Sequence, residues 1–130
     1  MNKSLAQNIS ICIGRLALTD SKKVGKYMDS YIKPFCISLR CVSDSVEKRD
    51  AFRGLCETIL RNPEGVFGAF NFFCGAICLF EKPPDDLELL FRKVIYLLHG
   101  KFENQFCTFI NKIPENLKMK MIQRFKLRVD

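Results

Sequence analysis

The sequence predicts an all-α fold in which antiparallel helix pairs stack into an α-solenoid. Apolar residues recur at the spacing of an amphipathic helix in two long stretches, and no stretch alternates as a β-strand does. Prolines mark places where helices begin, and several of these starts are evenly spaced. A compact bundle of about six or seven helices stays open as the alternative, because periodicity alone does not separate the two architectures.

The composition fits one ordinary globular domain over residues 1–130, with 48% hydrophobic and 27% charged residues. Lys and Arg outnumber Asp and Glu by 21 to 14, so the formal charge of +7 permits an acidic partner. The odd count of seven Cys and the lack of a signal-like start predict reduced thiols in an intracellular protein. The longest apolar stretch, 66–80, is shorter than the roughly 20 residues of a spanning helix, so no membrane contact is expected.

Two helices are predicted before the middle of the chain. The first has an apolar stripe that we expect to form its core face: Leu5, Ile9, Cys12, Ile13 and Leu16. The second starts near Asp44, because Glu47 follows three residues later with the spacing of a capping box. Its predicted core stripe is Phe52, Leu55, Cys56, Ile59 and Leu60.

Three proline sites predict the later helix starts. Asn62 and Pro63 suit the N-cap and first residue of a helix that contains the buried stretch 66–80. Pro84 precedes a helix whose apolar stripe is Leu87, Leu90, Phe91, Val94, Leu97 and Leu98, and Pro114 precedes the last helix. The starts near Asp44, Pro63 and Asp85 are roughly 20 residues apart, so pairs recur at about 40, in the range of HEAT-type repeats.

Several segments, in this order and at these spacings, resemble a known family. They are Asn8–Leu16, Tyr31–Arg40, Glu47–Cys56, Asn62–Val66, Phe72–Cys74, Pro84–Leu87 and Leu98–Gly100. Together they resemble the C-terminal end of the transportin family, importin-beta-type nuclear import receptors of the karyopherin group, from about Leu5 to Phe125. The resemblance implies a HEAT-repeat, armadillo-like solenoid segment over residues 1–130 that is truncated at its N-terminal side. Phe35, Phe80 and Phe106 stand where the family carries Trp.

The resemblance also implies a function without catalysis or a cofactor. The chain is expected to act in nuclear import, shuttling between cytoplasm and nucleus, and to bind cargo proteins through extended proline-tyrosine nuclear localisation signals. Contact with nucleoporins is expected only through a full-length receptor. The family's Ran-binding repeats lie near its N-terminus and are expected to be absent from this chain. A truncated paralogue that does not transport cargo is the alternative.

The candidate cargo-binding residues are Asn8, Ile11 and Arg15, which share one strip of the first helix. Asn can donate to and accept from a peptide backbone, Ile can contact an apolar side chain, and Arg can pair with a carboxylate or stack. The resemblance agrees, because the corresponding Asn and Ile of the family contact the cargo signal. The alternative is that Ile11 packs against a preceding helix.

Other chemistries find less support in the residues. Cys74 and Cys78 lie one helical turn apart, but no further ligands at zinc spacing accompany them, and His99 is the only histidine that could activate a thiol. We therefore expect buried thiols and no metal. A basic helical nucleic-acid-binding module remains an alternative because of two clusters, Lys22, Lys23 and Lys26 and then Lys112, Lys118, Lys120, Arg124, Lys126 and Arg128. Only Phe125 lies among the second cluster, so nucleic acid is not the expected partner.

Overall fold

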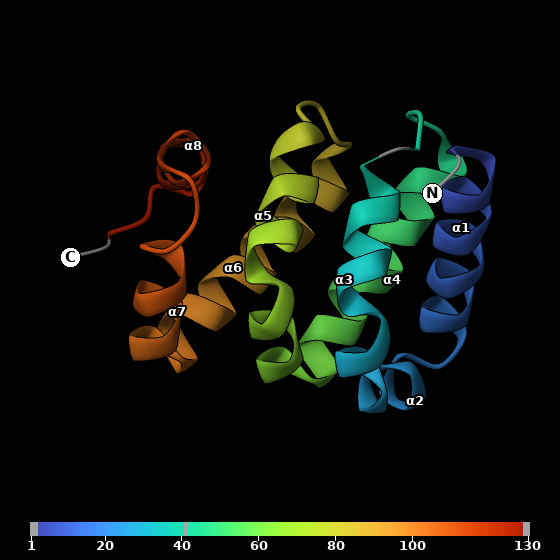
Figure 1. The fold of residues 1–130 in the computed structure, drawn as a ribbon, viewed down its shortest axis with the longest axis horizontal. Coiled ribbons are helices and arrows are strands. Elements are labelled where there is room, and N and C mark those ends of the chain that lie inside the picture. The colour runs from blue at the N-terminus through green and yellow to red at the C-terminus, as the bar shows by residue number, and fades with distance from the viewer. Residues whose placement is uncertain (1–2, 41, 129–130) are drawn as a thin grey trace.

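The computed structural model describes residues 3–40 and 42–128, and all regular structure in this part of the chain is helical. The elements are α1 (Lys3–Thr19), α2 (Ser21–Lys26), α3 (Met28–Leu39), α4 (Val46–Arg61), the 3-10 helix η1 (Pro63–Ala69), α5 (Phe70–Leu79), α6 (Asp85–Lys101), α7 (Glu103–Ile110) and α8 (Glu115–Phe125). Successive long helices run in opposite directions and stand in a row, from α1 at one end to α7 and α8 at the other (Figure 1). The predicted all-α fold is confirmed.

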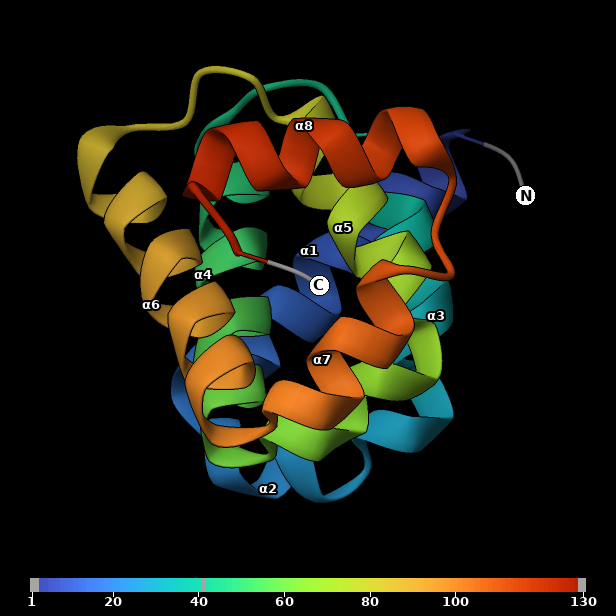
Figure 2. The ribbon, with the colours of Figure 1, turned by 90° about the vertical axis from the view of Figure 1, so that its left-hand side faces the viewer.

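The helices form two layers along this row. In one layer α4 packs between α1 and α6, and in the other η1 and α5 pack against α3. Figure 2, viewed along the row, shows α4 and α6 on one side and α3, α5 and α7 on the other, with α8 crossing over one edge. This arrangement of stacked pairs is that of an α-solenoid rather than of a compact bundle.

Phenylalanine rings fill the space between the layers. Phe52 of α4 lies 5.2 Å from the ring of Phe80 and 5.5 Å from that of Phe91, measured between ring centroids. Phe35, Phe80 and Phe106, at the positions where the family resemblance implies Trp, are all buried in the same core. Such tilted and edge-on aromatic contacts add to the stability that burial alone provides.

The second predicted helix is confirmed, but its start lies one residue later than expected. The N-cap of α4 is Ser45, whose side-chain oxygen accepts a hydrogen bond from the backbone N–H of Lys48 at 3.2 Å. Asp44 does not cap the helix, because its carboxylate pairs with Arg49 at 3.2 Å. The predicted core positions of α4 are buried, apart from Leu60, which is partly buried.

Asn62 and Pro63 occupy the predicted N-cap and first position of the next element, but that element is the 3-10 helix η1 and the Asn62 side chain does not cap it. Asn62 ends α4, and its side-chain amide donates to the carbonyl oxygen of Gly25 at 2.8 Å, which ties α4 to α2. The chain then forms the 3-10 helix η1 and becomes α-helical only at Phe70. The apolar stretch 66–80 is thus divided between two elements. No helix in the described ranges is long and apolar enough to cross a membrane.

Candidate functional site

The three candidate residues Asn8, Ile11 and Arg15, which we name the α1 strip, lie on α1. Asn8 and Arg15 are exposed, and Ile11 is half-buried. The side chains of Asn8 and Arg15 form no hydrogen bond or ion pair with any described residue. An amide, an apolar side chain and a guanidinium are therefore free to contact a ligand along about two turns of one helix.

Small residues hold α1 against α4 at very short range. We name this contact the glycine seam: Gly14, Ala17, Ala51 and Gly54. A methyl group on Gly14 would lie 2.5 Å from the Ala51 Cα atom, and one on Gly54 would lie 2.5 Å from the Gly14 carbonyl oxygen. Only residues without a Cβ atom permit so close an approach. The seam therefore fixes α1, and with it the α1 strip, relative to the rest of the fold.

A buried pair of hydroxyl groups ties α1 to α3. The Oγ atoms of Ser10 and Ser38 are 2.6 Å apart, and both residues are fully buried. Ser38 donates to the carbonyl oxygen of Phe35 at 2.8 Å, so the hydrogen between the two serines comes from Ser10. Because each buried hydroxyl is satisfied, the pair fixes the rotation of α1 about its axis and hence the direction of the α1 strip.

The predicted core stripe of the first helix is wrong at three of its five positions, although Ile13 does pack against the core. Leu5 is 53% exposed, Leu16 is 62% exposed, and Cys12 is exposed as well. Ile9 and Ile13 are half-buried. The face that packs most tightly is that of the glycine seam, because small side chains let the helices approach where branched ones would hold them apart. Periodicity identified the helix but assigned its buried face to the larger side chains.

Next to the exposed apolar residues of α1 lies a hollow that the sequence did not predict. This cavity of about 400 Å³ is lined by Leu16, Thr19, Asp20, Lys23, Val24 and Tyr27. Tyr27 is 57% exposed and lies between α2 and α3. No local pattern in the sequence brings Leu16 and Tyr27 together, since the connection through α2 places them. The end of the stack therefore presents apolar surface that suits contact with another helix.

Four of the described cysteines show no sign of activation. Cys36, Cys56 and Cys74 are buried, and burial raises the pKa of Cys36 to about 12 and those of Cys56 and Cys74 as well. Burial also raises the pKa of Cys78, although Arg124 nearby lowers it in part. Cys41 lies outside the described residues. A catalytic thiol needs a lowered pKa, so these four thiols do not fit that role.

Alkylation can test this description of the thiols. At about pH 8 we expect iodoacetamide to modify the exposed Cys12 of the folded protein and to leave Cys36 unmodified. Raising a thiol pKa from 9.0 to about 12 lowers its thiolate fraction by about a thousandfold. Peptide mass spectrometry at timed intervals measures both reactions, with Cys12→Ser as the control that removes the fast one. A buried thiol that reacts before Cys12 would support a thiol enzyme.

The only histidine already has structural partners. The Nε2 atom of His99 lies 3.0 Å from the carbonyl oxygen of Arg128, and its ring meets that of Phe106 edge-on at 5.0 Å between centroids. Among the residues that the structure describes, no group of three or more His, Cys, Asp or Glu side chains is placed to hold a metal ion. His99 is thus engaged in tethering the end of the chain to α6.

The two basic clusters differ in the aromatic surface that single-stranded nucleic acid would use. Phe125, the aromatic residue among the C-terminal charges, is fully buried. Arg124 is engaged, because its guanidinium binds Glu88 at 2.5 Å and the Ile77 carbonyl oxygen at 2.7 Å. Lys22, Lys23 and Lys26 lie on the short helix α2. The α2 cluster, in contrast, has an aromatic ring beside it, because Tyr27 is 57% exposed and its ring centroid lies 5.9 Å from the Lys26 Nζ atom.

Comparison with known proteins finds relatives for most of the chain. It is 44% identical to Transportin-1 of Mus musculus and of Homo sapiens over 103 residues, which are 79% of this chain and 11% of each relative. It is 28% identical to the Transportin of Dictyostelium discoideum over 130 residues, all of this chain and 14% of the relative. The chain thus spans little more than a tenth of these relatives. No model of a protein family matches it.

Proposed function

Because this chain is homologous to a segment of the transportins, we propose that it is a protein-binding segment of a nuclear import receptor, with the α1 strip as its cargo contact. The observation that carries the proposal is that Asn8 and Arg15, exposed and unpaired among the described residues, flank the half-buried Ile11 on a helix that the glycine seam holds in place. The names of the relatives are those of transport proteins, not of enzymes.

The chemistry of the strip suits an extended peptide. An exposed Asn amide can pair with both the N–H and the C=O of a peptide unit, and it does so without regard to side-chain identity. Ile11 offers a partly open apolar contact next to it, and the Arg15 guanidinium can bind a carboxylate or stack on an aromatic ring. A proline-tyrosine signal, which is extended and ends in an aromatic side chain, uses all three.

The rest of the proposal concerns the longer receptor. In it, a preceding helix pair covers the apolar surface around Leu16 and Tyr27, which a solenoid repeat would bury. Nucleoporin contacts belong to the full-length receptor, and the Ran-binding repeats lie outside this chain. The receptor shuttles between cytoplasm and nucleus. Support for these points is the homology over 79% of the chain, which spans 11% of the relatives.

A labelled peptide with a proline-tyrosine signal tests the α1 strip. We expect the double variant Asn8→Ala with Ile11→Asp to weaken binding by at least about tenfold, since it removes a hydrogen-bonding amide and places a charge at the apolar contact. Fluorescence anisotropy measures the dissociation constant, and circular dichroism confirms that the variant is folded.

The chain offers a matched control on α6 and α7. Leu89 and Asn104 are both exposed and belong to neither proposed site, so Asn104→Ala with Leu89→Asp makes the same chemical change elsewhere. We expect this variant to bind within about twofold of the unaltered chain. If both double variants lose affinity equally, or neither does, the assignment of the strip is wrong.

A further inference from the structure

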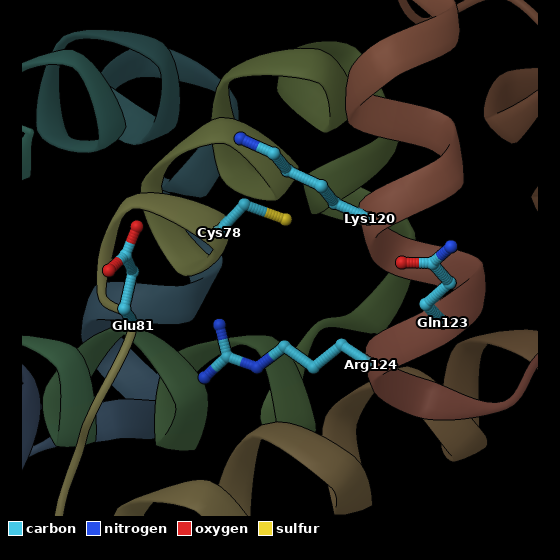
Figure 3. A pocket seen from close by; sticks show the side chains of 5 residues that line it. All are labelled: Cys78, Glu81, Lys120, Gln123 and Arg124. Atoms are coloured by element: carbon cyan, nitrogen blue, oxygen red, sulfur yellow. The ribbon is translucent and has the colours of Figure 1, made fainter.

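A groove runs between α5 and α8, on the layer of helices that does not contain α1. Two hollows of about 370 Å³ and about 330 Å³ share Cys78 and Lys120 in their linings. Figure 3 shows the larger one, with Cys78 and Glu81 on one side and Lys120, Gln123 and Arg124 of α8 on the other. The smaller hollow extends from Cys78 toward Arg40, beyond the end of α3. We name the smaller hollow the Arg40 groove.

The Arg40 groove carries two cations without partners. Neither the Arg40 guanidinium nor the Lys120 ammonium forms a hydrogen bond or ion pair with any described residue. The described lining contains no Asp or Glu; its residues are Arg40, Asn71, Gly75, Cys78, Leu79, Pro114, Asn116, Leu117 and Lys120. Arg124 lines the larger hollow, but its charge is already neutralised by the Glu88 carboxylate. The described lining of the Arg40 groove therefore carries two positive and no negative side chains, while Glu81 lines the adjoining hollow that shares Lys120.

The guanidinium of Arg40 is held close to the floor of the groove. Gly75 of α5 has no side chain to displace it, and a methyl group there would lie 3.6 Å from Nη1 and 3.7 Å from Cζ of Arg40. The planar fork therefore lies over Gly75, while Arg40 as a residue remains exposed and open to a ligand. A planar guanidinium presents its nitrogen atoms in a fixed geometry, so it loses less entropy for each hydrogen bond formed with a carboxylate.

The uncharged lining suits a peptide backbone. The amides of Asn71 and Asn116 stand in the same groove as the two cations, and each can donate to and accept from a peptide unit. Leu79 and Leu117 add apolar contact. Burial raises the pKa of Cys78, so its thiol stays neutral and does not oppose an anion. No aromatic side chain is among the described residues of the lining, so a stacking surface for nucleic-acid bases is lacking there.

We propose that the Arg40 groove binds an extended acidic segment of a partner protein, with a carboxylate held between Arg40 and Lys120. Arg40 supplies a bidentate contact and Lys120 a second positive charge, while Asn71 and Asn116 bond to the backbone on either side. This site goes beyond the proposed cargo contact, because it lies between α5 and α8 and uses none of the α1 strip. A failure of one site does not affect the other.

Anisotropy with a short fluorescein-labelled peptide, in which glutamate alternates with serine, tests the proposal. We expect Arg40→Gln with Lys120→Gln to weaken binding of this peptide by at least about tenfold. The control variant Lys22→Gln with Lys23→Gln removes the same charge from α2 and should change affinity by no more than about twofold. A second variant, Asn71→Asp, places a carboxylate in the groove and should also weaken binding.

Three outcomes would overturn the proposal. One is an equal loss in the groove and control variants, because binding would then follow net charge alone. Another is no difference between the glutamate peptide and the same peptide with glutamine. The third is tighter binding of a single-stranded oligonucleotide than of the acidic peptide, with the same loss on Arg40→Gln and Lys120→Gln, which would assign the groove to nucleic acid. Unchanged thermal melting of each variant excludes unfolding as the cause.

Discussion

Replacing Gly54 with valine should separate α1 from α4 and lower the free energy of unfolding by about 3 kcal/mol. A single methyl group at this position would already lie 2.5 Å from the Gly14 carbonyl oxygen and 3.0 Å from the Ala17 Cβ atom. Those atoms belong to a buried helix backbone and a buried methyl group, so neither can rotate away. Urea unfolding monitored by circular dichroism measures the change.

The effect should be local as well as large. Faster amide hydrogen exchange is expected throughout α1 of Gly54→Val, and its affinity for a proline-tyrosine peptide should fall although no residue of the α1 strip has changed. Gly100→Ala is the matched control, because Gly100 also lies in a helix and its added methyl group meets nothing within 4 Å. That change should stabilise the protein by about 0.5 kcal/mol. Equal effects of the two variants would show that the glycine seam does not position α1.

The helices that the sequence predicted best are those whose burial follows from their own periodicity. In α6, the positions Leu87, Phe91, Val94 and Leu98 are fully buried as expected, because α6 packs against other helices along one broad apolar face. Pro84 likewise occupies the N-cap of this helix, and acidic residues follow in its first turn. Local sequence signals predict the buried face of a helix correctly where the largest apolar side chains lie on that face.

The first helix shows where such signals fail. Its contact with α4 depends on the absence of side chains, at Gly14 and Gly54, and the two residues come together only in the folded chain. The sequence alone does not indicate that Gly14 and Gly54 contact each other's helices. The larger residues Leu5 and Leu16 were assigned to the core because they are apolar, yet both are exposed.

The α1 strip and the Arg40 groove also differ in how far the sequence predicts them. The α1 strip was predictable because Asn8, Ile11 and Arg15 share one helix, so their spacing alone places them on one face. The Arg40 groove was not predictable, since Arg40 follows α3 and Lys120 lies on α8, which are far apart in the sequence. The sequence does contain their charge, within the formal total of +7, but only the packing of α5 and α8 concentrates it in one groove.

Removing Arg124 should detach the last helix from the stack. The Arg124 side chain is 17% exposed. Its guanidinium binds Glu88 of α6 through two nitrogen atoms, at 2.5 and 3.3 Å, while a third donates to the Ile77 carbonyl oxygen of α5 at 2.7 Å. Arg124→Met keeps the apolar length of the side chain and leaves the Glu88 carboxylate with only Arg92, at 3.6 Å. Loss of charge-assisted hydrogen bonds from a largely buried carboxylate should lower the free energy of unfolding by about 2 kcal/mol.

A matched substitution separates this pair from an ordinary surface ion pair. Arg49 binds Asp44 at 3.2 Å, but the two side chains are 39% and 54% exposed, so Arg49→Met should cost less than about 1 kcal/mol. Urea unfolding of both variants, at low and at high salt, gives the comparison. The loss in Arg124→Met should persist at high salt because Glu88 is screened from solvent, whereas that in Arg49→Met should shrink. Equal losses that both vanish at high salt would mean that Arg124 acts only as a surface charge and that apolar packing alone holds α8 on α5 and α6.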